Sequence, residues 1–456
     1  MNIEIARMKS KSLSYSSLIL IHIIIALIIF VVPFLSKIYA LLIPIFGFLI
    51  VVRNQNKNNE VLFVAAYLVG VEVFLRMTGG NFNNEYVKFL VMFFMLLGMF
   101  FSNFSISSFV YIILLLLLIP GILVTTAVEN LDLDIKKALV FNLSGPFCLA
   151  IASIYTFKKR LLFSQLQNLL IAIGLPIVST VAYLFLYNPS VKDVVRGTAS
   201  NFETSGGFGP NQVSTILGLG MFVFFTQLIL FSKSKLTILL NGVLFIFITY
   251  RGIVTFSRGG IITGAVMILA LLFLLYYFSN SKGKGAFVLV FALTALMAVG
   301  IWGYSSMQTR GLIEKRYANQ DAKGRVKKDR LGGREAIIDT DLKLFFENPI
   351  TGIGAGMGKQ LREESTGHAS AAHNEISRML SEHGLSGVFG LFILLLTPFV
   401  LYFNNKQHLY FLSFFVFWFL TINHAAMRIA APAFIYALSL LSIQVKIPEN
   451  DEKSID

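Results

Sequence analysis

Residues 107–124, SSFVYIILLLLLIPGILV, form an uncharged apolar run of the length that crosses a bilayer as an α-helix. The whole chain has the same character: of its 456 residues, 56% are hydrophobic and 14% are charged, and the mean hydropathy is +0.74. A soluble domain is typically about 45–50% apolar and about a quarter charged. The composition therefore predicts a polytopic membrane protein and excludes a soluble enzyme.

About fourteen apolar segments are long enough, or nearly long enough, to cross a bilayer as helices. They cover residues 18–35, 38–52, 61–78, 86–101, 107–124, 137–156, 167–187, 211–231, 236–254, 259–278, 285–304, 385–403, 408–423 and 429–445. The second and the thirteenth segments are short. Because backbone polar groups inside a bilayer must be satisfied within the segment, we expect an all-α polytopic protein with about 12–14 transmembrane helices.

The distribution of Lys and Arg predicts the orientation of the chain, because cytoplasmic loops carry an excess of these residues. With the N-terminus inside, the inner short loops hold about fifteen Lys and Arg, and the outer short loops hold about ten. Both termini are then cytoplasmic, and the one long loop, residues 306–384, lies outside. The first apolar segment lacks a cleavage signal, so we expect it to remain as the first span.

The long loop is expected to be ordered and to contain short helices. It holds 13 Lys and Arg and 11 Asp and Glu. Apolar residues recur at helical spacing in residues 333–347 and again in 373–383. Asn348-Pro349 stops the first of these helices and Gly384 stops the second. We therefore divide the chain into three regions: N-terminal helices (1–187), a core that contains the loop (188–395), and C-terminal helices with a short tail (396–456).

Arg258 and Arg251 lie next to apolar spans, where a charged side chain is expensive and normally faces a partner or a cavity. Arg258 stands in TFSRGG (255–260), among small residues that leave space around it, and Arg251 lies seven residues earlier on nearly the same helical face. A guanidinium fork matches phosphate oxygens. We therefore expect both side chains to bind an anionic substrate, with snorkelling to the lipid headgroups as an equal alternative for Arg251.

Two further stretches near the same predicted membrane face carry polar side chains. The segment 188–210 contains Arg196 and a Gly-rich run, and Asn211 begins the next span. This segment is either part of the site or an ordinary flexible connector. His424 and Arg428 stand four residues apart in apolar surroundings, and they either line the same cavity or lie at the headgroup level.

His373 is the candidate general base. We expect it in the first turn of the helix 373–383, where the partly positive helix end disfavours the imidazolium and keeps the ring neutral. A neutral imidazole can take a proton from an attacking hydroxyl. Glu375, Glu382 and Asp339 are the alternative bases, and Asn374 stands between His373 and Glu375.

Other kinds of site are not indicated. The single cysteine, Cys148, and the six scattered histidines have no metal-ligand spacing, so we expect no metal and no cofactor. The glycine run 352–358 follows no predicted strand and therefore does not indicate a nucleotide site. The net charge of +14 fits the loops of a membrane protein, because no basic stripe with interleaved aromatic residues suggests nucleic acid.

Several motifs, in their order along the chain, resemble the O-antigen ligase and O-antigen polymerase superfamily. The matching stretches are RGTASNFETSGGFGPN (196–211), SRG (257–259), GRE (333–335), ENPITGIG (347–354), HNE (373–375) and EHGLSG (382–387). The resemblance covers residues 196–395. Residues 336–338, Ala-Ile-Ile, stand where the family often has an aromatic residue, so no sugar-stacking role is assigned there.

The resemblance implies a bacterial inner-membrane glycosyltransferase of the GT-C-like kind, which uses neither a metal nor a nucleotide sugar. Its donor would be a glycan on undecaprenyl diphosphate. Its acceptor would be a lipid A core sugar, a second lipid-linked glycan or a protein hydroxyl. His373 would be the base, and Arg258, Arg196 and Arg334 would hold the diphosphate. We expect the ligase of lipopolysaccharide biosynthesis, with the polymerase as the alternative within the superfamily.

A transporter of lipid-linked glycans is the main alternative outside this class. Transporters tend to have repeated halves with polar breaks near the bilayer midplane. Here the unusual residues gather at one predicted face and in one loop in the second half of the chain, which favours the transferase. A non-catalytic scaffold in envelope assembly is a further alternative.

Overall fold

The computed structural model describes residues 13–127, 134–327, 334–366 and 372–445. Within these residues the fold consists of helices and one pair of short strands. The helices up to the middle of the chain are α1 (Tyr15–Val31), α2 (Leu35–Asn54), α3 (Glu60–Met77), α4 (Tyr86–Phe101), η1 (Ile106–Ser108), α5 (Phe109–Thr126), α6 (Ile135–Thr156), α7 (Phe163–Tyr187), α8 (Val191–Val194), η2 (Glu203–Ser205), α9 (Pro210–Thr226) and η3 (Gln227–Phe231). The later helices are α10 (Lys235–Ile253), α11 (Arg258–Phe278), α12 (Ser281–Gln308), α13 (Leu312–Tyr317), α14 (Arg334–Glu347), α15 (Gly358–Thr366), α16 (Glu375–Asn404), α17 (Phe411–His424) and α18 (Ala431–Leu438). The strands are β1 (Arg160–Leu162) and β2 (Ser442–Gln444).

Nine of the described helices are long and apolar enough to cross a membrane, and α1, α4 and α17 are shorter apolar helices. α3 has 18 residues, but it carries Glu60, Glu72 and Arg76. Only 6% of the apolar part of α12 is buried, as expected for a helix that faces lipid. The chain is therefore an all-α multi-pass membrane protein, as the composition predicts.

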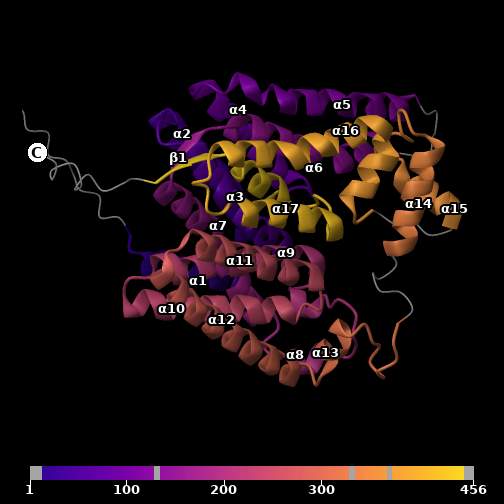
Figure 1. Ribbon diagram of the computed structural model, residues 1–456. Helices are drawn as coiled ribbons and strands as arrows, with labels where there is room; N and C mark the ends of the chain where they lie inside the picture. Colours follow the sequence, from indigo (N-terminus) through magenta and orange to yellow (C-terminus); the bar gives the residue numbers. More distant parts are fainter. Residues whose placement is uncertain (1–12, 128–133, 328–333, 367–371, 446–456) are drawn as a thin grey trace, which may run out of the picture.

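α9 lies at the centre of the bundle and packs against α7, α10 and α11 (Figure 1). Every residue of α9 from Val213 to Thr226 is buried. Small residues bring α9 and α11 close together, because a Cβ added at Gly218 would overlap the carbonyl group of Gly260. Such contacts between small residues are a common way for membrane helices to pack. The packing fixes the beginning of α11, and with it Arg258, against α9.

The last predicted span, residues 429–445, is wrong. α18 ends at Leu438, and the hydroxyl of Ser439 donates a hydrogen bond to the carbonyl of Tyr436 (2.6 Å). The chain then forms β2, which pairs in parallel with β1. The prediction failed because apolar length alone does not separate one long helix from a short helix followed by a strand.

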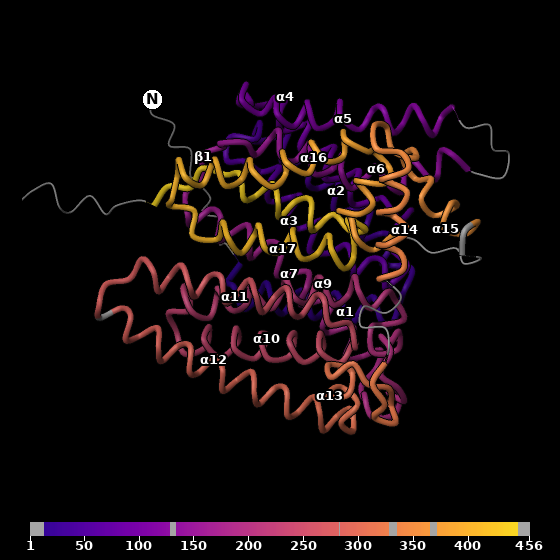
Figure 2. The backbone as a smooth tube through the Cα atoms, turned by 45° about the vertical axis from the view of Figure 1, so that its right-hand side comes forward, coloured from indigo at the N-terminus to yellow at the C-terminus, as the bar shows by residue number. Residues whose placement is uncertain are grey.

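The two ends of the helix bundle differ. β1 and β2 lie at one end, here named the strand end, and α1 begins there as well (Figures 1 and 2). α13, α14 and α15, which belong to the predicted long loop 306–384, lie at the opposite end, here named the loop end. The described chain therefore enters and leaves the bundle at the end opposite the loop.

The loop contains the predicted short helices, with one correction. α14 ends at Glu347 before Asn348-Pro349, as expected. The second helix, α16, begins at Glu375 and has a break at Gly384, where φ is 57° and ψ is −138°. Asn374 is its N-cap, and its side-chain oxygen accepts hydrogen bonds from two backbone N–H groups (2.8 and 3.1 Å). His373 therefore lies before the helix and not in its first turn, so the argument from the helix dipole does not apply to its ring.

Candidate functional site

Three contacts tie the His373 stretch to the end of α17. The backbone N–H of Ala426 donates to the carbonyl of His373 (3.1 Å). Arg428 Nη2 donates to the carbonyl of Ala372 (3.3 Å). The side-chain amide of Asn374 donates to Oδ1 of Asn423 (3.1 Å). His373, Asn374 and Arg428, which were predicted separately from the sequence, are therefore brought together at the loop end, and each is partly exposed.

His424 connects this group to α9 and α11. Its Nε2 lies 3.3 Å from the hydroxyl of Thr215, and its Nδ1 lies 2.8 Å from the carbonyl of Leu420. The imidazole ring packs directly against Gly259, because a Cβ at that position would overlap the ring. His424 therefore stands beside Arg258, the first residue of α11.

Asn211 joins the beginnings of the same two helices. Its side-chain oxygen accepts a hydrogen bond from the hydroxyl of Ser257 (2.8 Å), and its backbone carbonyl accepts one from Thr215 (2.7 Å). Asn211 is partly exposed. The prediction that Asn211 and Arg258 belong to one region is consistent with this geometry.

Arg258 lies next to the short helix α13. Its Nη1 donates to the carbonyl of Arg316 (3.4 Å), and Arg316 Nε donates to the carbonyl of Phe256 (3.0 Å). Burial raises the pKa of the neighbouring Tyr317 to about 12, while the charges of Arg258 and Arg316 act in the opposite direction. The phenol of Tyr317 therefore stays protonated near neutral pH.

A further arginine, which was not predicted from the sequence, contacts the residues around the His373 group. Arg76, in the last turn of α3, donates to Gln212 Oε1 (3.2 Å) and to the carbonyl of Arg428 (3.0 Å). It also forms an ion pair with Glu72 (2.6 Å). The signal that could have found it is the pair of opposite charges four residues apart in an otherwise apolar helix.

Arg251 does not join the site. It is fully buried, and its guanidinium donates to the carbonyls of Leu184 (2.6 Å) and Asn188 (3.1 Å) at the end of α7. It also lies over the ring of Phe185, 5.0 Å from the centroid. A cation at these carbonyls stabilises the end of a helix, so neither expectation for Arg251, substrate binding or snorkelling, describes its position.

Arg196 lies in the segment that follows α8. Arg196 is exposed, in a segment that docks on the loop through a hydrogen bond from the Thr198 hydroxyl to the carbonyl of Gln320 (2.8 Å). Lys327 Nζ donates to the same hydroxyl (2.9 Å). The side chain of Arg334, at the beginning of α14, lies outside the described part of the structure.

Glu375 is unsuited to be an alternative base. Its side chain is 3% exposed and forms an ion pair with Arg378, which also pairs with Glu382 (2.9 Å). A buried carboxylate that is ion-paired in this way has little access to an acceptor hydroxyl. Glu382 is likewise buried, whereas His373 is partly exposed and Asp339 is exposed.

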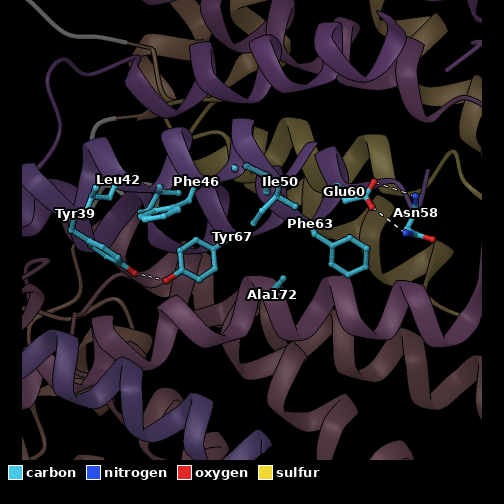
Figure 3. Close-up of a pocket in the computed structure, with 12 residues that line it drawn as sticks. Tyr39, Leu42, Phe46, Ile50, Asn58, Glu60, Phe63, Tyr67 and Ala172 are labelled. Atoms are coloured by element: carbon cyan, nitrogen blue, oxygen red, sulfur yellow. Dashed lines mark hydrogen bonds between the residues drawn. The ribbon is translucent and has the colours of Figure 1, made fainter. Parts of the chain in front are cut away.

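A large groove lies elsewhere in the described chain. A groove of about 720 Å³ separates α2 from α3 and α7, and its lining is mostly apolar (Figure 3). The hydroxyls of Tyr39 and Tyr67 are hydrogen-bonded to each other within it. Tyr67 lies nine residues before Arg76 on α3, which places the two side chains on opposite faces of the helix. The groove therefore does not open onto the His373 group. Among the described residues, no cluster of three His, Cys, Asp or Glu could hold a metal ion.

Comparison with protein families gives one match. Residues 242–395 match a family model described as O-antigen ligase. A search of curated proteins found no match to this chain. The matched part contains Arg258 and His373, whereas Arg76, His424 and Arg428 lie outside it. The resemblance noted from the motifs is therefore confirmed for the central part of the chain.

Proposed function

Because residues 242–395 match the O-antigen ligase family, we propose that the protein transfers a glycan from undecaprenyl diphosphate to an acceptor sugar at the outer face of the inner membrane. The family match supports a membrane glycosyltransferase of the ligase or polymerase type. The specific donor, the acceptor and the cytoplasmic placement of both termini are parts of the proposal.

The observation that carries the proposal is a series of contacts at the loop end, which runs from the His373 stretch through the end of α17 to the beginning of α11. His424 packs against Gly259, next to Arg258. On its other side, Asn423 binds Asn374, next to His373. Arg258 is the first residue of the apolar helix α11, His373 precedes α16, and both residues are partly exposed.

This arrangement suits displacement of a diphosphate by a hydroxyl. The acceptor oxygen forms a bond to the anomeric carbon, and the bond from that carbon to the diphosphate oxygen breaks, with the electron pair leaving on the diphosphate. His373 takes the hydroxyl proton. Arg258 and Arg428 hold the developing negative charge, and Tyr317 can donate a hydrogen bond to it. A single displacement inverts the configuration at the anomeric carbon, and NMR of the product would overturn this step if the configuration were retained.

The acceptor decides between ligase and polymerase. We favour the ligase because the match is to the ligase model. The polymerase uses the same base and the same leaving group, and it differs only in accepting a second lipid-linked glycan.

The experiment is the envelope glycan profile, by gel, of a strain that lacks the gene. The strain is complemented with the wild type, with His373→Ala, or with His408→Gln as a matched control. His408 lies buried at the strand end, with Nε2 2.9 Å from the carbonyl of Leu438, and Gln can keep that contact. We expect wild type and His408→Gln to restore the profile and His373→Ala to fail at equal protein levels.

Each profile has a defined meaning. If the strain that lacks the gene has a lipid A core without glycan, and the glycan remains on the lipid carrier, the protein is the ligase. If its lipid A core carries a single repeat unit, the protein is the polymerase. Normal transfer by a well-expressed His373→Ala protein would overturn the role of His373. Movement of labelled lipid-linked glycan across the membrane without any covalent product would support the transporter and overturn the proposal.

A further inference from the structure

The segment between α17 and α18, residues 425–430, is held by charged side chains from α3 and α4. Lys88 Nζ donates to the carbonyl of Met427 (3.2 Å), and Arg76 Nη2 donates to the carbonyl of Arg428 (3.0 Å). Glu72 Oε2 accepts a hydrogen bond from the backbone N–H of Ala430 (2.7 Å). An irregular buried segment needs such partners, because its backbone groups are not satisfied by a helix.

These charges form a neutral group of four, here named the charge quartet: Glu72, Arg76, Glu85 and Lys88. Glu72 pairs with Arg76 (2.6 Å) and Glu85 pairs with Lys88. The hydroxyl of Ser144 donates to Glu85 Oε2 (2.7 Å). The side chains of Glu72 and Lys88 are each 1% exposed, and those of Arg76 and Glu85 are 7% and 9% exposed.

Stability alone is a poor reason for burying two ion pairs. The desolvation of the charges offsets much of their attraction, and apolar residues of similar volume are often as stable or more stable. Three members of the quartet form directed hydrogen bonds with three backbone groups of the segment 425–430. Apolar residues could not form these bonds. The geometry of the quartet therefore indicates that it positions the segment 425–430.

The opposite side of the same segment binds the His373 stretch. The N–H of Ala426 donates to the carbonyl of His373, and Arg428 Nη2 donates to the carbonyl of Ala372. Ala426 has a φ of 51°, a left-handed conformation that is rare for a residue other than glycine. Strained backbone of this kind persists only where its surroundings fix it, and the quartet contacts the adjacent residues.

We propose that the charge quartet positions His373 for catalysis through the segment 425–430. This inference rests on the proposed function, in which His373 takes the acceptor proton. It assigns a role to four residues of the N-terminal helices, all outside the part that matches the ligase family. Its members are positioning residues, which act through the backbone that they hold.

The test uses purified full-length protein and measures transfer from lipid-linked glycan extracted from the strain that lacks the gene. Lys88→Met removes the bond to Met427 but leaves Glu85 unpaired. Glu85→Gln/Lys88→Met removes both charges of the pair, and Lys88→Arg keeps the cation. A misplaced catalytic group of this kind can lower the rate by roughly 10-fold to 100-fold. We expect that loss in kcat for Lys88→Met and for the double variant, with the donor KM unchanged, and recovery of most of kcat in Lys88→Arg.

Gln167→Leu is the matched structural control. Gln167 is 2% exposed and accepts a hydrogen bond from Tyr410 (2.7 Å), which joins α7 to the beginning of α17 at the strand end. We expect Gln167→Leu to lower the thermal stability while kcat per folded molecule stays at the wild-type value. The quartet variants should lower kcat per folded molecule, which a purely structural role does not do.

The outcomes separate this inference from the proposed function. A folded double variant with wild-type kcat, when His373→Ala is inactive, would overturn the positioning role and leave the function intact. An equal fall in activity per folded molecule for Gln167→Leu would also overturn it. A fully active His373→Ala protein would remove the proposed base and with it the inference.

Discussion

The imidazole of His424 packs against Gly259, so closely that a side chain at position 259 would occupy the same space. The same ring has Nε2 3.3 Å from the hydroxyl of Thr215. This contact joins the end of α17 to the beginning of α11, and it therefore sets how far Arg258 lies from the His373 stretch.

Gly259→Ala should displace the ring of His424 and lower transfer strongly while the protein still folds. Alanine is a good helix residue, and Gly259 lies in α11, so the change affects the helix itself little. A shift of about 1 Å between reacting groups can reduce a rate by about 100-fold. Initial rates of the purified variant check this, with Gly285→Ala as the control, because an added Cβ at Gly285 meets open space. Equal rates for the two variants would contradict the proposed geometry.

Arg258→Lys should lose most of the transfer activity. Lysine keeps the charge but lacks the planar fork that binds two phosphate oxygens at once. We expect the donor KM to rise because Arg258 holds the diphosphate in the ground state, and kcat to fall because the charge that develops on the leaving diphosphate is held less well in the transition state. Steady-state kinetics over a range of donor concentrations measure both. Wild-type values for Arg258→Lys would show that the bidentate contact is not used.

Arg251→Ala should lower the stability of the protein and leave its transfer activity unchanged, the opposite of Arg258→Lys. It leaves the carbonyls of Leu184 and Asn188 without their donor and should lower the free energy of unfolding by about 2–4 kcal/mol. Transfer per folded molecule should stay near the wild-type value. Thermal unfolding in detergent, measured beside the kinetics, tests both statements. A stable but inactive variant would return Arg251 to the substrate site.

The positions of these two arginines show why helical periodicity in the sequence could not predict the contacts of Arg251. Arg251 and Arg258 are seven residues apart, and a single helix would place them on nearly the same face. In the structure α10 ends at Ile253 and α11 begins at Arg258. The two side chains therefore belong to different helices, and a periodicity argument cannot pass through the turn between them.

Features with a local cause could be predicted. The length of the apolar segments predicted most of the helices. Asn348-Pro349 and Gly384 mark the ends of short helices, as expected. The approach of Arg76 to Arg428 could not be predicted, because it joins residues 352 positions apart in the chain. The same is true of the pairing of β1 with β2, which depends on how the helices between them fold.

The stability of the strand end should depend on pH through Lys159. Burial lowers the pKa of Lys159 to about 8, whereas an unfolded lysine has a pKa of about 10.4. Between about pH 8 and pH 10.4 the unfolded chain binds more protons at this residue, so its contribution makes the folded state more stable as the pH rises. The Tm of Lys159→Met, measured from pH 7.5 to 10, should lack this contribution. Lys406→Met, a change of an exposed lysine, is the control and should follow the wild-type curve.

Gly384→Ala should disrupt the loop that carries the candidate base. At a φ of 57° and a ψ of −138°, only glycine is free of strain, and an added Cβ would lie 2.6 Å from the carbonyl oxygen of Pro349. The break at Gly384 also leaves the carbonyls of Ser381 and Glu382 to accept hydrogen bonds from the loop residues Ile353 (2.9 Å) and Gly354 (3.2 Å).

We expect Gly384→Ala to lower the free energy of unfolding by about 1–3 kcal/mol and to reduce transfer, because the docked loop leads into the His373 stretch. Gly300→Ala is the control: Gly300 lies inside α12 with open space around it, and alanine there should stabilise the helix by up to about 1 kcal/mol. Thermal unfolding and transfer are measured for both variants. If Gly384→Ala were as stable and as active as Gly300→Ala, the break in α16 would not be needed to hold the loop. The contacts of residues 352–358 with α16 would then not position His373.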